Sequence, residues 1–100
     1  MNNMVYVVLT IEYERGWGSK PDGYLAFLSK KSADDFIKTQ TKDRNGPAPD
    51  YYVNYEHVGE KPCSLDFQLA VMASKSGFLY VDSCEELLWS AERRKTKYRA

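Results

Sequence analysis

The sequence predicts an α+β domain, with a largely antiparallel sheet of about five strands and two helices in the order β-β-α-β-β-β-α. Three observations support this prediction. Apolar and polar residues alternate over several short segments, which is typical of strands with one buried face. Clusters of glycine and proline separate these segments. Two further stretches have the spacing and the capping residues of helices.

The first two strands are expected at residues 5–13 and 24–28. Every second side chain from Val5 to Tyr13 is apolar or aromatic, and β-branched residues are frequent there, so one face of this strand should be buried. Residues 15–22 include two glycines and a proline, which predict a reversal of the chain. The second strand should therefore pair antiparallel with the first.

A helix is expected to start after Ser29 and to run to about Lys42. The Ser29 hydroxyl is placed to accept a hydrogen bond from a free amide of the first turn. A narrow stripe at helical spacing predicts that the helix lies flat on the sheet; it comprises Ala33, Phe36, Ile37 and Gln40. Residues 43–50 should form a loop, because one glycine and two prolines break the helix there.

Three more strands are expected in the second half of the chain. Residues 51–58 alternate again, and a turn over residues 59–62 should end that strand. Residues 65–73 also alternate, so we expect a strand that returns through a turn at 74–77 into a last strand at 78–81. A helix over residues 64–76 stays open as the alternative, because Ser64 is able to cap it and Gly77 to end it.

The second helix is expected to run from about Cys84 into the C-terminal segment. Two overlapping capping-box patterns precede its apolar residues, Asp82-x-x-Glu85 and Ser83-x-x-Glu86. Acidic residues near its start and basic residues near its end both suit the helix dipole.

Length and composition indicate one globular domain over residues 1–100, with 43% apolar and 28% charged residues. No apolar stretch approaches the roughly 18 residues of a membrane span, and no secretory signal is evident, so cytoplasmic residence is expected. Cys63 and Cys84 are expected to be reduced thiols. With His57 as the single histidine they make a poor zinc ligand set, and no cofactor is expected.

Charge is uneven along the chain although the formal net charge is zero. Five of the fourteen basic residues fall within 93–99, which leaves nine basic against fourteen acidic residues in the rest. The tail over residues 93–100 is expected to be frayed, and it could neutralise several phosphates of a nucleic acid through Arg93, Arg94, Lys95, Lys97 and Arg99. The alternative is a helix end whose charges only keep the protein soluble.

The sequence contains no recognisable catalytic set, so we expect a protein that is not an enzyme. Glu56 and His57 are neighbours on a strand and point to opposite faces, so Glu56 cannot orient His57 as a general base. Glu12 and Glu14 share a strand face and could in principle hold a magnesium ion, although such pairs more often face solvent. The glycines around Trp17 lack the lysine and the strand-to-helix context of a phosphate-binding loop.

Aromatic residues are in surplus, with eight tyrosines and two tryptophans in 100 residues. Tyrosine and tryptophan supply large, rigid contact area with a polar group, which is favoured at protein interfaces. Four of them are expected outside the core: Tyr6, Trp17, Tyr52 and Trp89. We expect these four to form a partner-binding surface, with Glu12 and Glu14 as its acidic flanks. The alternative is that they pack the second face of the sheet against the C-terminal helix.

Residues 4–60 resemble a family of small uncharacterised α+β domains from phage, prophage and bacterial reading frames. The resemblance comprises a Val-Tyr-Val strand, a Gly-led second strand that ends in Phe-x-Ser, a helix that begins with Ala and acidic residues, and a Tyr-x-x-x-Tyr-Glu strand. The matching residues are Val5, Tyr6, Val7, Gly23, Phe27, Ser29, Ala33, Asp34, Asp35, Tyr51, Tyr55 and Glu56. The resemblance implies a viral or mobile-element context and no chemistry.

Together these patterns favour a non-catalytic accessory protein of a phage or mobile element, acting as a monomer or homodimer. It would bind and modulate or inhibit a host protein complex, for example a defence system, in the host cytoplasm. The alternative is a small nucleic-acid-binding accessory protein that uses the basic C-terminal segment.

Overall fold

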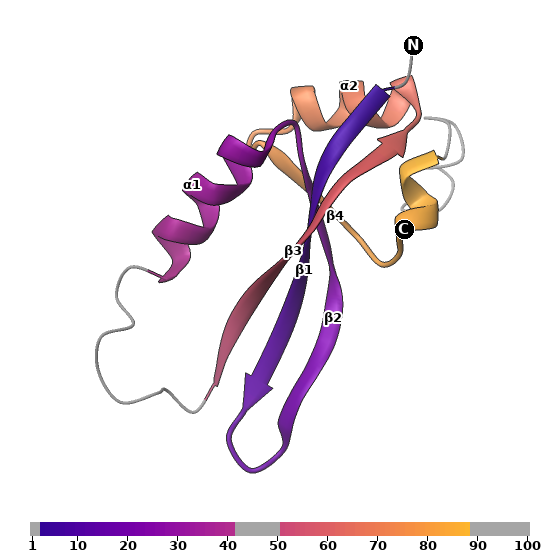
Figure 1. Cartoon of the computed structure of the whole chain (residues 1–100). Coiled ribbons are helices and arrows are strands. Elements are labelled where there is room, and N and C mark those ends of the chain that lie inside the picture. The colour runs from indigo at the N-terminus through magenta and orange to yellow at the C-terminus, as the bar shows by residue number, and fades with distance from the viewer. Residues whose placement is uncertain (1–2, 42–50, 89–100) are drawn as a thin grey trace.

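The computed structural model describes residues 3–41 and 51–88. Its strands form one antiparallel sheet in the order β3-β1-β2-β4, so the predicted α+β class is confirmed (Figure 1). The described part has four strands and not five. Along the chain the elements are β1 (Asn3–Glu14), β2 (Gly18–Phe27), α1 (Lys30–Thr41), β3 (Tyr51–Cys63), α2 (Leu65–Ala73), β4 (Phe78–Val81) and a 3-10 helix, η1 (Cys84–Leu88).

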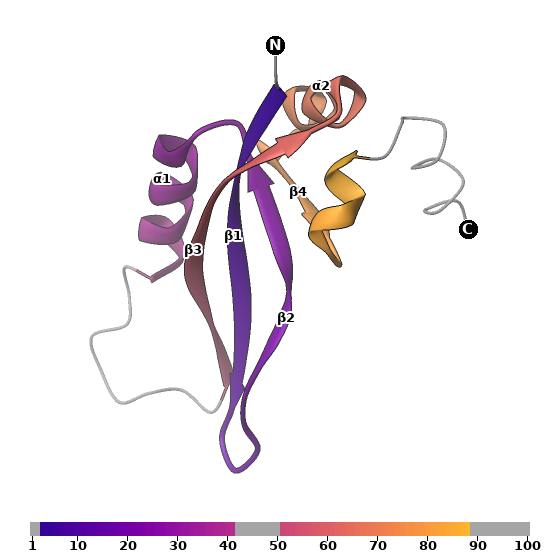
Figure 2. The same ribbon diagram turned by 45° about the vertical axis from the view of Figure 1, so that its right-hand side comes forward.

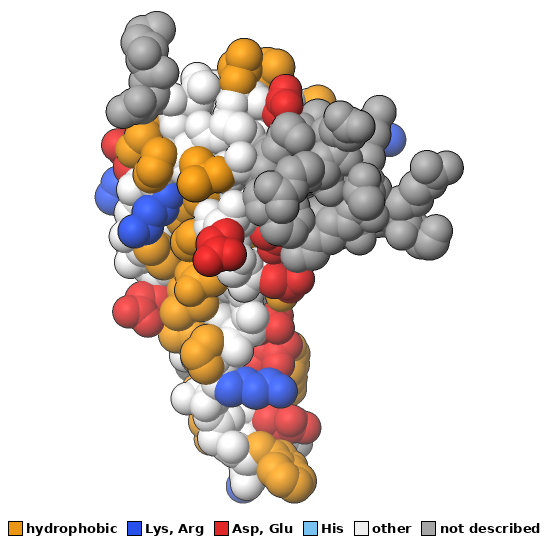
Figure 3. Space-filling view, turned by 90° about the vertical axis from the view of Figure 1, so that its right-hand side faces the viewer, with side chains coloured by type: hydrophobic (Ala, Val, Ile, Leu, Met, Phe, Trp, Pro, Cys, Tyr) orange, Lys and Arg blue, Asp and Glu red, His pale blue; other side chains and the backbone are white. Residues whose placement is uncertain are grey.

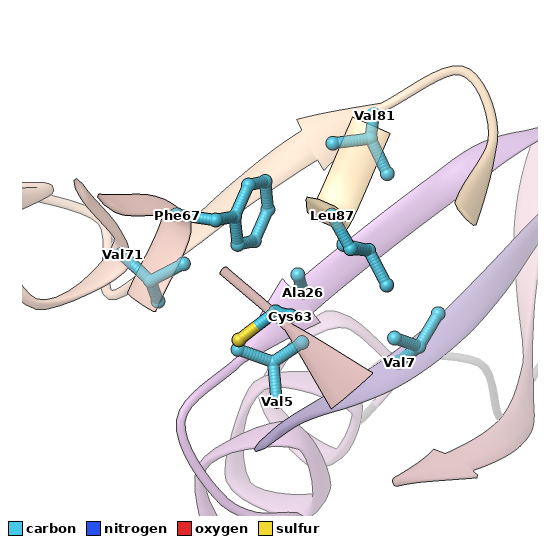
Figure 4. Packing of buried hydrophobic residues seen from close by; sticks show 8 residues of the cluster. All are labelled: Val5, Val7, Ala26, Cys63, Phe67, Val71, Val81 and Leu87. Atoms are coloured by element: carbon cyan, nitrogen blue, oxygen red, sulfur yellow. The ribbon is translucent and has the colours of Figure 1, made fainter. Parts of the chain in front are cut away.

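Helices cover both faces of the sheet at one end only. α1 lies on one face, and α2 and η1 lie on the other (Figures 1 and 2). Beneath α1, the buried cluster comprises Tyr6, Val8, Leu25, Phe27 and Ala33. On the opposite face the larger cluster brings all three C-terminal elements onto β1 and β2 (Figure 4): Val5, Val7, Ala26, Cys63, Phe67, Val71, Val81 and Leu87.

Beyond the helices, β1, β2 and the start of β3 continue as a narrow three-stranded extension (Figure 1). We call this extension the arm and define it as residues 11–22 and 51–54; the remaining described residues are the body. Every arm residue is exposed or half-buried. The sheet therefore has two parts: the body has a core on each face, and the arm has none.

A β-bulge marks the junction between body and arm. Leu9 pairs with Tyr24 but Ile11 pairs with Pro21, so β2 carries an extra residue opposite Thr10. The buried Thr10 hydroxyl donates to the Gly23 carbonyl at 2.9 Å and accepts from the Gly23 N–H at 3.1 Å. These two bonds satisfy backbone groups that the irregular pairing would otherwise leave without partners.

β3 extends further than the sequence predicts, because the expected turn at residues 59–62 is wrong. The strand continues to Cys63 across a second bulge, in which Val7 pairs with Gly59 and Val8 pairs with His57. Gly59 has φ +112°, a backbone conformation that L side chains rarely adopt. The glycine serves a bulge inside the strand and does not end it.

The strand expected at residues 65–73 is also wrong, because this segment forms α2. The Ser64 hydroxyl accepts from the Phe67 N–H at 3.0 Å, which is the cap that the helical alternative required. Phe67 and Val71 face the core, while another apolar stripe is exposed: Leu65, Leu69 and Met72. The predicted strand at Phe78–Val81 is present, but it pairs with β2 at the edge of the sheet.

Two of the other predicted caps are present, at Ser29 and at Ser83–Glu86, and the helix expected from Cys84 is the short 3-10 helix η1 as far as Leu88. Ser29 caps α1, where its hydroxyl accepts from the Ser32 N–H at 3.2 Å. The buried Glu86 carboxylate accepts from the backbone N–H groups of Asp82 and Ser83, as the capping-box pattern predicts. The predicted loop at 43–50 and any continuation of the second helix past Leu88 lie outside the described residues.

Both cysteines are free thiols, as the sequence predicts. Burial raises the pKa of the Cys63 thiol, which disfavours its reactive thiolate form. Within residues 3–41 and 51–88, no helix has the length and apolar character needed to cross a membrane.

Candidate functional site

The arm brings together four of the six residues that the sequence assigns to partner binding. Glu12, Glu14 and Trp17 line one pocket with a volume of about 220 Å³, together with Gly18, Ser19 and Lys20. Tyr52 lies on the opposite face of the same arm, where it pairs with Tyr13 of β1. Trp89 lies outside the described residues.

The pocket follows from the local geometry of the β1–β2 turn. Glu12 and Glu14 are two positions apart on β1, so both side chains point to the same face of the sheet. The turn closes with a hydrogen bond of 3.0 Å from the Trp17 N–H to the Glu14 carbonyl. Gly16 and Gly18 flank Trp17 with φ of +88° and +83°, which tightens the turn and leaves Trp17 84% exposed at its end.

Tyr51 fixes one of the two carboxylates. It lies opposite Glu14 in the β1–β3 register, and its hydroxyl donates to Glu12 Oε1 at 3.2 Å. Partial desolvation and the nearby Glu12, Asp22 and Glu14 carboxylates raise the pKa of Tyr51. The shift extends the pH range over which the phenol stays protonated and donates to Glu12.

Negative charge continues from the pocket along one edge of the arm. Desolvation and then the Asp22 and Asp82 carboxylates raise the pKa of Tyr80 on β4. Two phenols at separate points therefore lie close to carboxylates, and Asp22 influences both. Figure 3 shows acidic side chains along one edge of the arm, beside a column of hydrophobic side chains, and a basic side chain between this column and the hydrophobic group at the end of the arm.

The other face of the arm carries a pair of stacked rings. Tyr13 and Tyr52 lie directly opposite in the register, with ring centroids 4.7 Å apart and an interplanar angle of 28°. Both are half-buried by their neighbours, and neither belongs to a core cluster. The prediction that Tyr52 lies outside the core is confirmed.

The corresponding prediction for Tyr6 is wrong. Tyr6 is 7% exposed and packs beneath α1 with Val8 and Phe27, and its hydroxyl is 2.8 Å from His57 Nδ1. The prediction assumed that only the Val5–Val7 face of β1 is buried, whereas helices cover both faces in the body. Tyr6 is a core residue and does not reach a partner.

His57 has an acidic neighbour that the sequence does not reveal. Its Nε2 is 3.6 Å from Asp34 Oδ1 of α1, and Asp34 also accepts from Lys30 Nζ at 2.8 Å. That hydrogen bond is the main reason that the pKa of Asp34 is lowered and the pKa of Lys30 is raised. The contact depends on how α1 packs over β3, and only the predicted flat packing of the helix pointed to it.

This chain of contacts links α1 to β3 at the surface. Tyr6 and Asp34 hold the two ring nitrogens of His57. His57 lines neither the pocket beside Trp17 nor a second, shallower pocket of about 360 Å³ between α1 and the turn before β4. The hydroxyls of Thr39 and Ser76 in that second pocket are engaged with backbone carbonyls of their own segments. The contacts of His57, Thr39 and Ser76 give these three side chains a structural role.

The described residues offer no metal-ligand cluster, and the basic tail lies outside them. Across the described ranges, no three His, Cys, Asp or Glu side chains group together to hold a metal ion. The five residues proposed for nucleic-acid binding lie outside those ranges: Arg93, Arg94, Lys95, Lys97 and Arg99. Comparisons with protein-family models, with curated proteins and with solved structures gave no match to this chain.

Proposed function

We propose that this chain is a non-catalytic binding protein of a phage or mobile genetic element, and that its arm docks onto a host protein complex. The arm carries this proposal, because it is a regular part of the sheet in which no residue is buried. Docking there would modulate or inhibit the complex, for example a defence system, inside the host cell.

The arm combines a regularly paired backbone with aromatic side chains. Its three strands are antiparallel neighbours and continue directly from the helix-covered body. Trp17 projects at the end and the Tyr13–Tyr52 pair covers one face. Aromatic side chains supply large contact area with few rotatable bonds, so less conformational entropy is lost on binding.

The exposed apolar surface of the arm also supports a role in binding a partner. Figure 3 shows a hydrophobic column and a separate hydrophobic group at the end of the arm, with acidic side chains beside both. Apolar patches rimmed by polar residues mark interaction sites in soluble proteins. The aromatic side chains of the arm therefore have the composition and the setting of an interface.

Capture of a partner from host lysate tests this function. The wild-type protein is expected to retain a specific partner that Trp17→Ala and Tyr52→Ala both lose. Met72→Ala is the matched control, because Met72 is an exposed apolar residue on α2, outside the arm. A partner retained equally by both arm variants would contradict docking through the arm.

Nucleic-acid binding through the basic segment is the second candidate, and the charge of residues 93–99 favours it. Binding of this kind should weaken as salt rises, because neutralised phosphates release counterions. Deleting residues 93–100 should abolish it, whereas Trp17→Ala should leave it unchanged. Nucleic-acid binding that survives the deletion would rule this candidate out.

A further inference from the structure

We propose that the pocket beside Trp17 accepts a basic side chain, arginine or lysine, from a segment of the protein partner. This inference rests on the proposed function, because it names the chemistry that the arm recognises. It depends on three features of the arm: an exposed indole, two carboxylates on the same strand face, and a negative edge that extends beyond the pocket.

The indole supplies one wall of the pocket and is open to solvent. Trp17 is 84% exposed, and it lines the same pocket as Glu12 and Glu14. A guanidinium or ammonium group over an indole face is attracted by the ring quadrupole, and arginine also stacks on it through its planar group. A ring and two carboxylates in one pocket thus favour a flat or compact cation.

The carboxylates determine the sign of the charge that fits. Glu12 and Glu14 place two negative groups in the pocket and Lys20 places one positive group, so the lining keeps a net negative charge. Asp22 adds to this field, since it acts on Tyr51 together with both glutamates. A carboxylate or phosphate of a partner would be repelled there, and a basic side chain would be attracted.

One carboxylate is already oriented before a ligand arrives. The Tyr51 hydroxyl holds Glu12 through one oxygen, at 3.2 Å, which leaves the other oxygen for a partner. The pKa of Tyr51 is raised above its ordinary value, so the hydroxyl stays a donor to a more alkaline pH than a free phenol would. A charge-assisted hydrogen bond from arginine or lysine to the remaining oxygen gains from an acceptor that is already fixed.

Short synthetic peptides of matched length test the proposal directly. One carries arginines, and in the second each arginine is replaced by citrulline, which has the same shape without the charge. A third carries glutamates. In a Trp89→Phe background Trp17 is the sole tryptophan of the chain, so its fluorescence reports the pocket alone. The arginine peptide is expected to change this fluorescence to saturation, and the citrulline and glutamate peptides are not.

Variants of the pocket give effects of opposite sign. Glu12→Gln with Glu14→Gln should weaken arginine-peptide binding about tenfold, as loss of charged contacts at an interface does. Lys20→Met should strengthen it, because a competing positive charge is removed. Glu60→Gln is the matched control, since Glu60 is an exposed glutamate on β3 in the body and should leave binding unchanged.

The result that overturns the proposal is equal binding of the arginine and citrulline peptides, or no binding of either. Weaker binding of the arginine peptide by the Lys20→Met variant would contradict the net negative charge assigned to the pocket. These outcomes differ from a failure of the proposed function. If lysate capture depends on Trp17 and Tyr52 but not on Glu12 and Glu14, the arm still binds a partner and only the basic side chain is refuted.

Discussion

The body and the arm are parts of one sheet with opposite relations to solvent. In the body, β1 is buried on both faces: Val5 and Val7 lie in one core, and Tyr6 and Val8 lie in the other. In the arm the same strand continues to Glu14, and none of the described helices lies over it. Strand pairing and a few surface side-chain contacts hold the arm together, whereas buried side-chain packing holds the body. The two parts should therefore respond differently to the same kind of substitution.

This difference separates stability from binding within a chain of 100 residues. Buried apolar area supplies most of the free energy of folding, and the body has nearly all of it. The arm is left free to carry an indole, stacked tyrosines and carboxylates on an exposed surface. Substitutions of buried residues in the body should lower the free energy of unfolding, and substitutions in the arm should change it little.

The largest effect is expected for Phe67→Ala in the body. Phe67 is 0% exposed and fills the core between α2 and the sheet (Figure 4). Its removal leaves a cavity and should lower the free energy of unfolding by about 3–5 kcal/mol. Leu69→Ala, two positions along the same helix but 49% exposed, should cost far less. Urea unfolding of both variants checks this, and equal losses would contradict the assignment of the buried helix face.

The next effect is expected for Thr10→Val at the junction. Valine keeps the shape of threonine but loses the hydroxyl that bonds both the N–H and the carbonyl of Gly23. Two buried backbone groups would lose a partner, at a cost of about 1–3 kcal/mol. Thr39→Val on the exposed side of α1 is the control and should change little. A neutral Thr10→Val variant would mean that the bulge does not depend on this residue.

A smaller effect is expected for Gly23→Ala, because of the ring that lies across this glycine. A Cβ at Gly23 would come 2.3 Å from the Tyr80 hydroxyl, so the ring must move away. Tyr80 is partly exposed and able to swing, so the cost should be about 1 kcal/mol. In a Tyr80→Ala background the same change should cost less, and thermal unfolding of the four proteins measures this coupling. Additive effects would contradict the contact.

The smallest effect on stability is expected for Trp17→Ala at the end of the arm. The side chain is 84% exposed, so its loss should alter the free energy of unfolding by less than about 0.5 kcal/mol. Hydrogen exchange should show the same contrast, with amides of the arm exchanging faster than those of Val5 to Val8. Strong destabilisation by Trp17→Ala would end the distinction between body and arm.

The elements that the sequence predicts correctly are those in which polar residues mark the exposed face or the start of the element. β1 alternates against threonine and glutamate, α1 follows the Ser29 cap, and η1 follows the Ser83–Glu86 capping pattern. α2 has no such polar face, because apolar residues occur all round the helix. Leu65 and Leu69 lie on its exposed side and Phe67 and Val71 on its buried side, so alternation along the sequence resembles a strand.

The candidate site is predictable in part for the same reason. Trp17, Glu12 and Glu14 meet because they belong to one hairpin, and a hairpin is a local structure. The sequence misplaces Tyr6 because its burial depends on α1, and it gives no sign that Asp34 of α1 lies beside His57. Contacts made across elements distant in sequence leave no local pattern to detect.

The backbone hydrogen bond of 2.8 Å from the Ser64 N–H to the Leu87 carbonyl has a consequence for the order of assembly. During translation, β1, β2, α1 and β3 leave the ribosome before the residues that cover Val5, Val7 and Ala26. One face of the nascent sheet is then complete while the other exposes a bare aliphatic layer, the kind of surface on which partly made chains aggregate. Only when Leu87 meets the start of α2 is that layer sealed, so a stalled chain that ends before α2 is a natural substrate for chaperones.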